Sequence, residues 1–171
     1  NQRIHRTLLD RLRKAPGVEA VGSSNRLPLL GESWINPLER VDSASSQAAP
    51  AGSWRFVSPG YFDAAGTRVL AGRDFAESDR DDRVAVVSKR VADEMFPGET
   101  PLGKFLYQRE NGQKYRARII GIVENAKAKG IENGPPLLVY LPDWHLNSPA
   151  AFYVVRSAGD PGDIAREVRR I

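Results

Sequence analysis

The chain has 171 residues, of which 41% are hydrophobic and 27% are charged, with a formal net charge of +4 and no cysteine. This composition excludes a disordered or membrane-embedded chain, and the absence of thiols excludes disulfides, thiolate metal sites and cysteine nucleophiles. At this length about 70% of the unfolded surface can be buried, so the chain can form a sizeable core in one or two small domains.

The basic excess lies at the amino-terminal end. Residues 1–14 contain five basic side chains and one acidic side chain, an excess of four that equals the net charge of the whole chain. Such a segment suits anionic lipid headgroups or phosphate, and it is equally typical of a solvated helix face. The longest apolar run is far shorter than the roughly 20 residues that a membrane-spanning helix needs. Because Asn1 follows neither an initiator methionine nor a signal-peptide pattern, we expect a piece of a longer protein.

The first quarter of the chain predicts a helix followed by two strands. In chain order the expected elements are a helix at residues 2–15, a strand at 18–27, a weaker strand at 34–42 and a loop at 43–52. Ile4, Leu8 and Leu12 recur every four residues, which favours an amphipathic helix. Pro37 indicates an edge position for the second strand, because proline cannot donate to a sheet ladder.

The middle of the chain is organised around a short helix between strands at residues 54–57 and 67–70. Ser58 is expected to cap the helix through its hydroxyl, Pro59 to occupy the first helical position, and Gly66 to end the helix. Tyr61 and Phe62 should be buried.

Residues 76–83 are rich in acidic side chains and arginine. Asp79, Asp81 and Asp82 suggest a calcium loop, but the glycine and the bidentate glutamate that such a loop requires are absent. We therefore expect a solvated connector.

The second half of the chain predicts a strand at 84–87, a helix capped by Ser88, strands at 105–110, 113–123, 137–141 and 151–156, and a helix opening at residue 160. Asn111 and Gly112 favour a type I′ hairpin turn, and residues 119–123 are apolar on both faces, as in a central strand. Helices at both ends with short strands between them predict an α+β fold. We expect two subdomains, one formed by residues 1–80 and 146–171 and the other by the inserted residues 81–145.

No pattern in the sequence identifies a chemical site. His5 and His145 have no spacing that pairs them, and zinc-ligand, nucleophile-elbow and phosphate-loop motifs are absent. We therefore predict no catalytic, cofactor-binding or metal-binding residue. Carboxylates could meet in space for acid–base work, but nothing selects a pair. Trp34, Trp54 and Trp144 could line a ligand site, although core packing also explains each of them.

Seven short segments resemble a known family in their order and spacing. They are VSPGYF at residues 57–62, LAGRDF at 70–75, VAVVS at 84–88, FPGE at 96–99, PLGK at 101–104, IGIV at 120–123 and VYLP at 139–142. In these segments the chain resembles the MacB-like periplasmic core domain of bacterial ABC transporter permeases of the FtsX-like and MacB type.

The resemblance implies an architecture and a location. The domain would lie on the outer face of the cytoplasmic membrane, between the first and second transmembrane helices of the permease. A porter-like α+β subdomain (residues 1–80 and 146–171) would carry an inserted, mostly β, Sabre-like subdomain (residues 81–145). The basic helix would then lie just outside the first membrane span. The family shares no catalytic or cofactor residue.

The function implied by the resemblance is mechanical. The domain would be non-catalytic and would couple ATP-driven movement of transmembrane helices to a periplasmic partner or cargo, in export or mechanotransmission. The expected partners are the transmembrane helices of the same permease, a cytoplasmic ATP-binding subunit, a second permease copy and a periplasmic protein or lipoprotein, and no nucleic acid. The alternative is an extracytoplasmic ligand-binding or sensory module, suggested by the tryptophans and the loop at 43–52. An enzyme is supported only by the unassigned carboxylates.

Overall fold

Within the residues that the structure describes, a mixed sheet is flanked by short helices. The computed structural model describes residues 2–26, 34–42, 49–110, 112–126, 135–146 and 152–159, together with Gly162. In chain order the elements are α1 (Gln2–Lys14), β1 (Val18–Ser24), β2 (Ile35–Pro37), β3 (Glu39–Arg40), β4 (Ala51–Val57), α2 (Tyr61–Ala64), β5 (Val69–Gly72), the 3-10 turn η1 (Glu77–Asp79), β6 (Val84–Ser88), α3 (Lys89–Met95), β7 (Phe105–Glu110), β8 (Gln113–Val123), β9 (Leu138–Pro142), the 3-10 turn η2 (Asp143–His145) and β10 (Phe152–Ser157).

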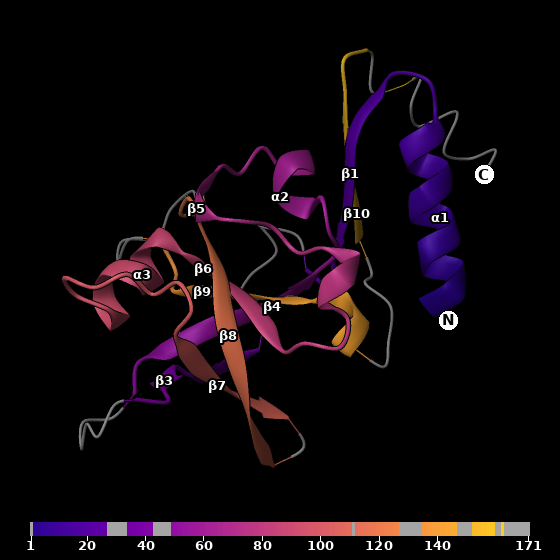
Figure 1. The fold of residues 1–171 in the computed structure, drawn as a ribbon. Coiled ribbons are helices and arrows are strands. Elements are labelled where there is room, and N and C mark those ends of the chain that lie inside the picture. The colour runs from indigo at the N-terminus through magenta and orange to yellow at the C-terminus, as the bar shows by residue number, and fades with distance from the viewer. Residues whose placement is uncertain are drawn as a thin grey trace.

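The strands lie in the order β10-β1-β4-β9-β6-β8-β7-β3, with β2 paired to β4 and β5 paired to β8 (Figure 1). The pairs β4–β9 and β6–β8 are parallel and the others are antiparallel. Every residue of β6 and β9 is buried, as expected for strands that are covered on both faces. The α+β prediction is confirmed.

The sheet contains strands from both predicted subdomains. Three of its pairs, β3–β7, β4–β9 and β5–β8, join a strand from residues 1–80 to a strand from residues 81–145. The division into subdomains stays a prediction.

The core is divided between the two faces of the sheet. On one face, Trp54 and Phe56 pack with Val91 and Phe96, which belong to α3 and the turn after it. On the other face, Val57 packs with the aromatic side chains around α2, which are Tyr61, Phe62, Phe75 and Tyr140. The alternation of side chains along β4 therefore supplies both layers.

Helix α1 begins and ends close to prediction, but its expected buried face is partly wrong. Ile4 is 70% exposed, and the side chains that face the sheet are His5, Leu9 and Leu12, at spacings of four and three residues. Leu9 and Leu12 pack on Val21 of β1. The helix turns this way because His5 finds polar partners beneath it, which remove the cost of burying an imidazole.

The capping prediction for α2 is wrong. Gly60, with φ of 84°, is the N-cap, and no side chain caps the helix. The Ser58 hydroxyl instead accepts a hydrogen bond from the backbone N–H of Ser23 at 2.9 Å, which ties the helix to β1. The expected burial of Tyr61 and Phe62 is confirmed.

Three strand boundaries differ from prediction. Residues 34–42 form two short strands rather than one, because β2 pairs with β4 whereas β3 pairs with β7. Residues 51 and 52, expected in a loop, begin β4, and the strand expected at 67–70 is β5 at Val69–Gly72. The remaining loop residues 43–48 and the predicted carboxy-terminal helix, apart from Gly162, lie outside the described residues.

The acidic connector is not solvated throughout. Asp79 is only 3% exposed, and its carboxylate accepts two hydrogen bonds from Arg73, at 2.6 and 2.7 Å. The Arg73 guanidinium holds the pKa of Asp79 below its ordinary value. No group of three or more histidine or acidic side chains in the described ranges could hold a metal ion.

Two local predictions hold at the positions that the structure describes. The Ser88 hydroxyl accepts from the backbone N–H of Val91 and caps α3. Strands β7 and β8 form the predicted hairpin, with Glu110 paired to Gln113 and Gly112 at φ of 78°, whereas Asn111 lies outside the described residues. None of the described helices is long and apolar enough to cross a membrane.

Candidate functional site

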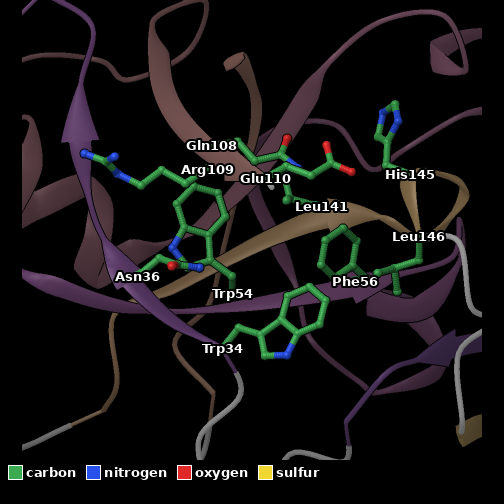
Figure 2. Close-up of a pocket in the computed structure, with 10 residues that line it drawn as sticks. All are labelled: Trp34, Asn36, Trp54, Phe56, Gln108, Arg109, Glu110, Leu141, His145 and Leu146. Atoms are coloured by element: carbon green, nitrogen blue, oxygen red, sulfur yellow. The ribbon is translucent and has the colours of Figure 1, made fainter. Parts of the chain in front are cut away.

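A cavity of about 330 Å³ lies at the meeting point of β2, β4, β7, β9 and η2 (Figure 2). Its apolar lining consists of Trp34, Trp54, Phe56, Leu141 and Leu146, and its polar lining consists of Asn36, Gln108, Arg109, Glu110 and His145. Figure 2 shows the indole and phenyl rings on one side of this space and the side chains of Gln108 and Glu110 on the other. The cavity thus has an apolar side and a polar side.

The apolar side follows from strand alternation and register. Trp54 and Phe56 point to the same face of β4, and Leu141 of β9 lies beside Phe56 in the parallel register. The ring of Trp34 meets Phe56 edge-on, with centroids 5.4 Å apart. Trp54 is 2% exposed, whereas Trp34 is 55% exposed. Trp34 therefore forms the mouth of the cavity and Trp54 its interior wall.

The charges on the polar side are already paired within the protein. Arg109 donates to Glu39 at 2.5 Å, and Glu110 accepts from Arg83 at 3.2 Å. The same Arg83 donates to the buried carboxamide of Gln108 at 3.4 Å. Each charge is therefore held by an opposite charge from another part of the chain.

His145 contributes a neutral imidazole to the rim. Burial lowers the pKa of His145, so the ring is uncharged at neutral pH. Its Nε2 lies 3.3 Å from the backbone carbonyl oxygen of Asp82. A carbonyl only accepts, so this contact places the ring proton on Nε2 and leaves Nδ1 as an acceptor.

The second histidine lies in a separate polar cluster beneath α1. The ring of His5 contacts Asp143 Oδ2 through Nε2 at 2.9 Å and the Tyr153 hydroxyl through Nδ1 at 2.8 Å. The Ser23 hydroxyl lies 3.2 Å from His5 Nε2 and donates to Asp143 Oδ2 at 3.1 Å. A catalytic triad requires serine and carboxylate on opposite ring nitrogens, and here both lie at Nε2. The cluster instead joins α1 to β1, η2 and β10.

One charged side chain that the sequence analysis missed is buried in the centre of the sheet. Arg55 of β4 is 3% exposed, and within the described residues its Nε and Nη1 have no hydrogen-bond partner. The guanidinium lies near the phenol of Tyr61. Its position between Trp54 and Phe56 could have indicated burial, because a strand covered on both faces must bury every residue.

The two histidines and three tryptophans singled out in the sequence lie in several different places in the structure. His5 and His145 lie in different clusters, as their spacing suggested. Trp34 and Trp54 meet in one cavity, whereas Trp144 packs edge-on against Phe75 and beneath Arg80. No local sequence pattern indicates the polar side of the cavity, because β7 and η2 are distant from β4 in the chain.

The comparisons with known proteins concern both sequence and fold. The family model for the MacB-like periplasmic core domain matches residues 2–171. The periplasmic region of MacB from Actinobacillus actinomycetemcomitans aligns with a TM-score of 0.65 and 18% identity, covering 96% of this chain and 71% of that chain. The extracellular domain of the ABC-type transporter YknZ from Gram-positive bacteria aligns with a TM-score of 0.58 and 19% identity, covering 95% of this chain and 76% of that chain.

At these identities the two solved structures show a shared fold, whereas the family model spans nearly the whole sequence. The comparison with curated proteins found no match. The chain belongs to the MacB-like periplasmic core domain family, the part of ABC transporter permeases that lies on the extracytoplasmic side of the membrane.

Proposed function

We propose that this domain is non-catalytic and passes ATP-driven movement of the permease's transmembrane helices to a periplasmic partner or cargo. The observation that carries the proposal is the firm attachment of α1 to the sheet. Figure 1 shows α1 alongside β1 and β10, and the helix is fixed there by Leu9, Leu12 and the cluster around His5. A helix held by both apolar and buried polar contacts moves together with the strands beneath it.

The partners follow from the type of transporter. A MacB-type permease implies transmembrane helices and an ATPase. The proposal adds a second permease copy and a periplasmic protein or lipoprotein, which the moving sheet would engage. It also retains the division into a porter-like subdomain (residues 1–80 and 146–171) and an inserted Sabre-like subdomain (residues 81–145). In this arrangement the movement of the transmembrane helices reaches the domain through α1, and residues 81–145 transmit it to the periplasmic partner.

The test measures the distance between the two domains of an intact transporter. These 171 residues contain no cysteine, so Asp81→Cys introduces one thiol into the domain, at an exposed position before β6. With any cysteine elsewhere in the full-length permease replaced by serine, each copy carries one spin label. Distances between the labels are compared in the nucleotide-free and ATP-trapped complex with its ATPase in lipid nanodiscs. We expect the distance distribution to shift on trapping. An unchanged distribution would contradict coupling.

A second pair of variants tests the role of α1. His5→Ala and Leu12→Ala remove the polar and the apolar attachment, and each should reduce the shift of the label while ATP hydrolysis continues. Thr7→Ala is the matched control, because Thr7 is exposed on the same helix and its hydroxyl donates to the backbone carbonyl of Arg3 in that helix. If all three variants behave like the parent, the movement does not pass through this attachment. Circular dichroism verifies that each variant is folded.

A further inference from the structure

We propose that the cavity between β4, β7, β9 and η2 binds a small uncharged amphiphile, with an aromatic or branched apolar body and one N–H or O–H group. This inference goes beyond the coupling role, because the isolated domain would bind the molecule without ATP or a partner. None of the comparisons with known proteins assigns a ligand-binding residue to this cavity. The size, the apolar side and the polar side of the cavity each restrict the kind of molecule that fits.

The apolar side selects the body of the ligand. A volume of about 330 Å³ lies within the range of sites for small molecules. Trp34 remains 55% exposed at the mouth. Large apolar side chains that stay exposed around a cavity indicate a binding surface, since covering them is favourable. A flat ring system can stack on Trp34 and reach Phe56 behind it.

The polar side excludes a charged ligand. Arg109 is neutralised by Glu39, and Glu110 is neutralised by Arg83. An anionic ligand would have to compete with Glu39 for Arg109 and lie near Glu110, and a cationic ligand would meet the reverse arrangement. Either charge would lose its hydration without gaining an unpaired partner. A neutral molecule avoids this cost.

The rim selects the polar group of the ligand. His145 is uncharged, and its contact with the Asp82 carbonyl leaves Nδ1 as an acceptor. Figure 2 shows the His145 ring above the cavity near the Glu110 carboxylate, so two acceptors lie on one side of the rim. A ligand that presents an N–H or O–H to this side gains a hydrogen bond, whereas one that presents only an acceptor to His145 Nδ1 and the Glu110 carboxylate does not.

The test uses N-phenyl-1-naphthylamine, a neutral fluorescent probe with two aromatic units and one N–H group. The probe is titrated into the purified 171-residue domain, and its fluorescence and the energy transfer from tryptophan are recorded. We expect saturable binding at one site. Trp34→Ala should weaken binding about tenfold, because an aromatic contact is lost. Leu70→Ala is the control, because Leu70 is exposed on β5 and does not line the cavity, and this variant should bind as the parent does.

Two relatives of the probe test the chemistry of the site. 1-Anilinonaphthalene-8-sulfonate shares its skeleton but carries a negative charge, and the N-methyl derivative lacks the donor. Both should bind more weakly than the parent probe, and His145→Ala should reduce the difference between the probe and its N-methyl derivative, because one of the two acceptors is lost. The proposal is overturned by non-saturable binding, by equal affinity of Trp34→Ala and the parent domain, or by equal affinity of the sulfonate. Thermal unfolding of each variant shows whether it is folded.

Discussion

Arg55 is the residue whose burial is hardest to reconcile with stability. Its side chain lies inside the sheet, where a guanidinium loses its hydration, and two of its nitrogens have no partner within the described residues. An unsatisfied buried polar group costs about 1–3 kcal/mol, more when it is charged. Tyr61 offers a neutral phenol in place of a carboxylate. The domain therefore carries a local cost at this position.

Replacing this guanidinium with an apolar side chain should stabilise the domain. We expect Arg55→Met to raise the free energy of unfolding by about 1–2 kcal/mol, because the penalty for the unpaired nitrogens disappears. Urea denaturation followed by circular dichroism measures the change. Arg55→Lys is the control, since it keeps the charge and should give no gain. A large loss of stability in Arg55→Met would mean that the guanidinium is well paired.

Sequence patterns captured residues whose role depends on near neighbours. The Ser88 cap depends on a backbone group three residues away, and the burial of Tyr61 and Phe62 follows from their position on a short helix. The partners of His5, in contrast, are 18, 138 and 148 residues away along the chain. No local pattern contains such contacts. The cavity is also invisible to local patterns, because its lining residues come from segments that are far apart in the sequence.

At the scale of elements, the close approach of α2 to β1 determines how the middle of the chain is held. A Cβ atom on Gly22 would lie 2.3 Å from the Cα atom of Tyr61, which is far inside van der Waals contact. Only glycine lets the helix lie this close to the strand. The contact is with backbone, so a rotated side chain cannot relieve it.

The variant Gly22→Ala should therefore displace α2 from β1. We expect a loss of about 1–3 kcal/mol in the free energy of unfolding, the range that overpacking costs. Gly159→Ala is the control, because nothing lies within 4 Å of the added Cβ at that position. Thermal and urea denaturation of both variants give the comparison. Equal stability of the two would show that the strand and helix can move apart without cost.

Element types were more predictable than their pairing and orientation. Helix α1 was expected from its periodicity, but its buried face contains His5, whereas Ile4 is exposed. Ser58 had the right chemistry for a cap and instead bonds to β1. In both cases a tertiary hydrogen bond outweighed a local preference, and periodicity does not record tertiary hydrogen bonds.

At the scale of the whole molecule, the continuous sheet links the two predicted subdomains. Strand β4 pairs with β9 through five residue pairs, and β5 pairs with β8. Separating residues 81–145 from the rest would break these ladders and expose apolar side chains on both faces. Because this separation is costly, residues 81–145 and the rest of the domain depend on each other for stability.

This coupling predicts a single unfolding unit. In native-state hydrogen exchange with increasing urea, the amides of β4 and those of β6 and β8 should reach the same opening free energy and the same urea dependence. The edge strands β3 and β10 should exchange earlier, because each pairs with one neighbour in the described sheet. Earlier opening of β6 and β8 together, with β4 still protected, would instead indicate that residues 81–145 unfold independently.

The sheet order also sets the sequence of events when the chain is made. Among the described strands, β1 pairs along its length with β10, and the parallel neighbour of β4 is β9, so both early strands must wait for partners that are synthesised much later. Long-range pairing of this kind slows folding, and unpaired edges attract other chains in the meantime. The first half of the domain is therefore exposed to aggregation until β9 and β10 have been synthesised.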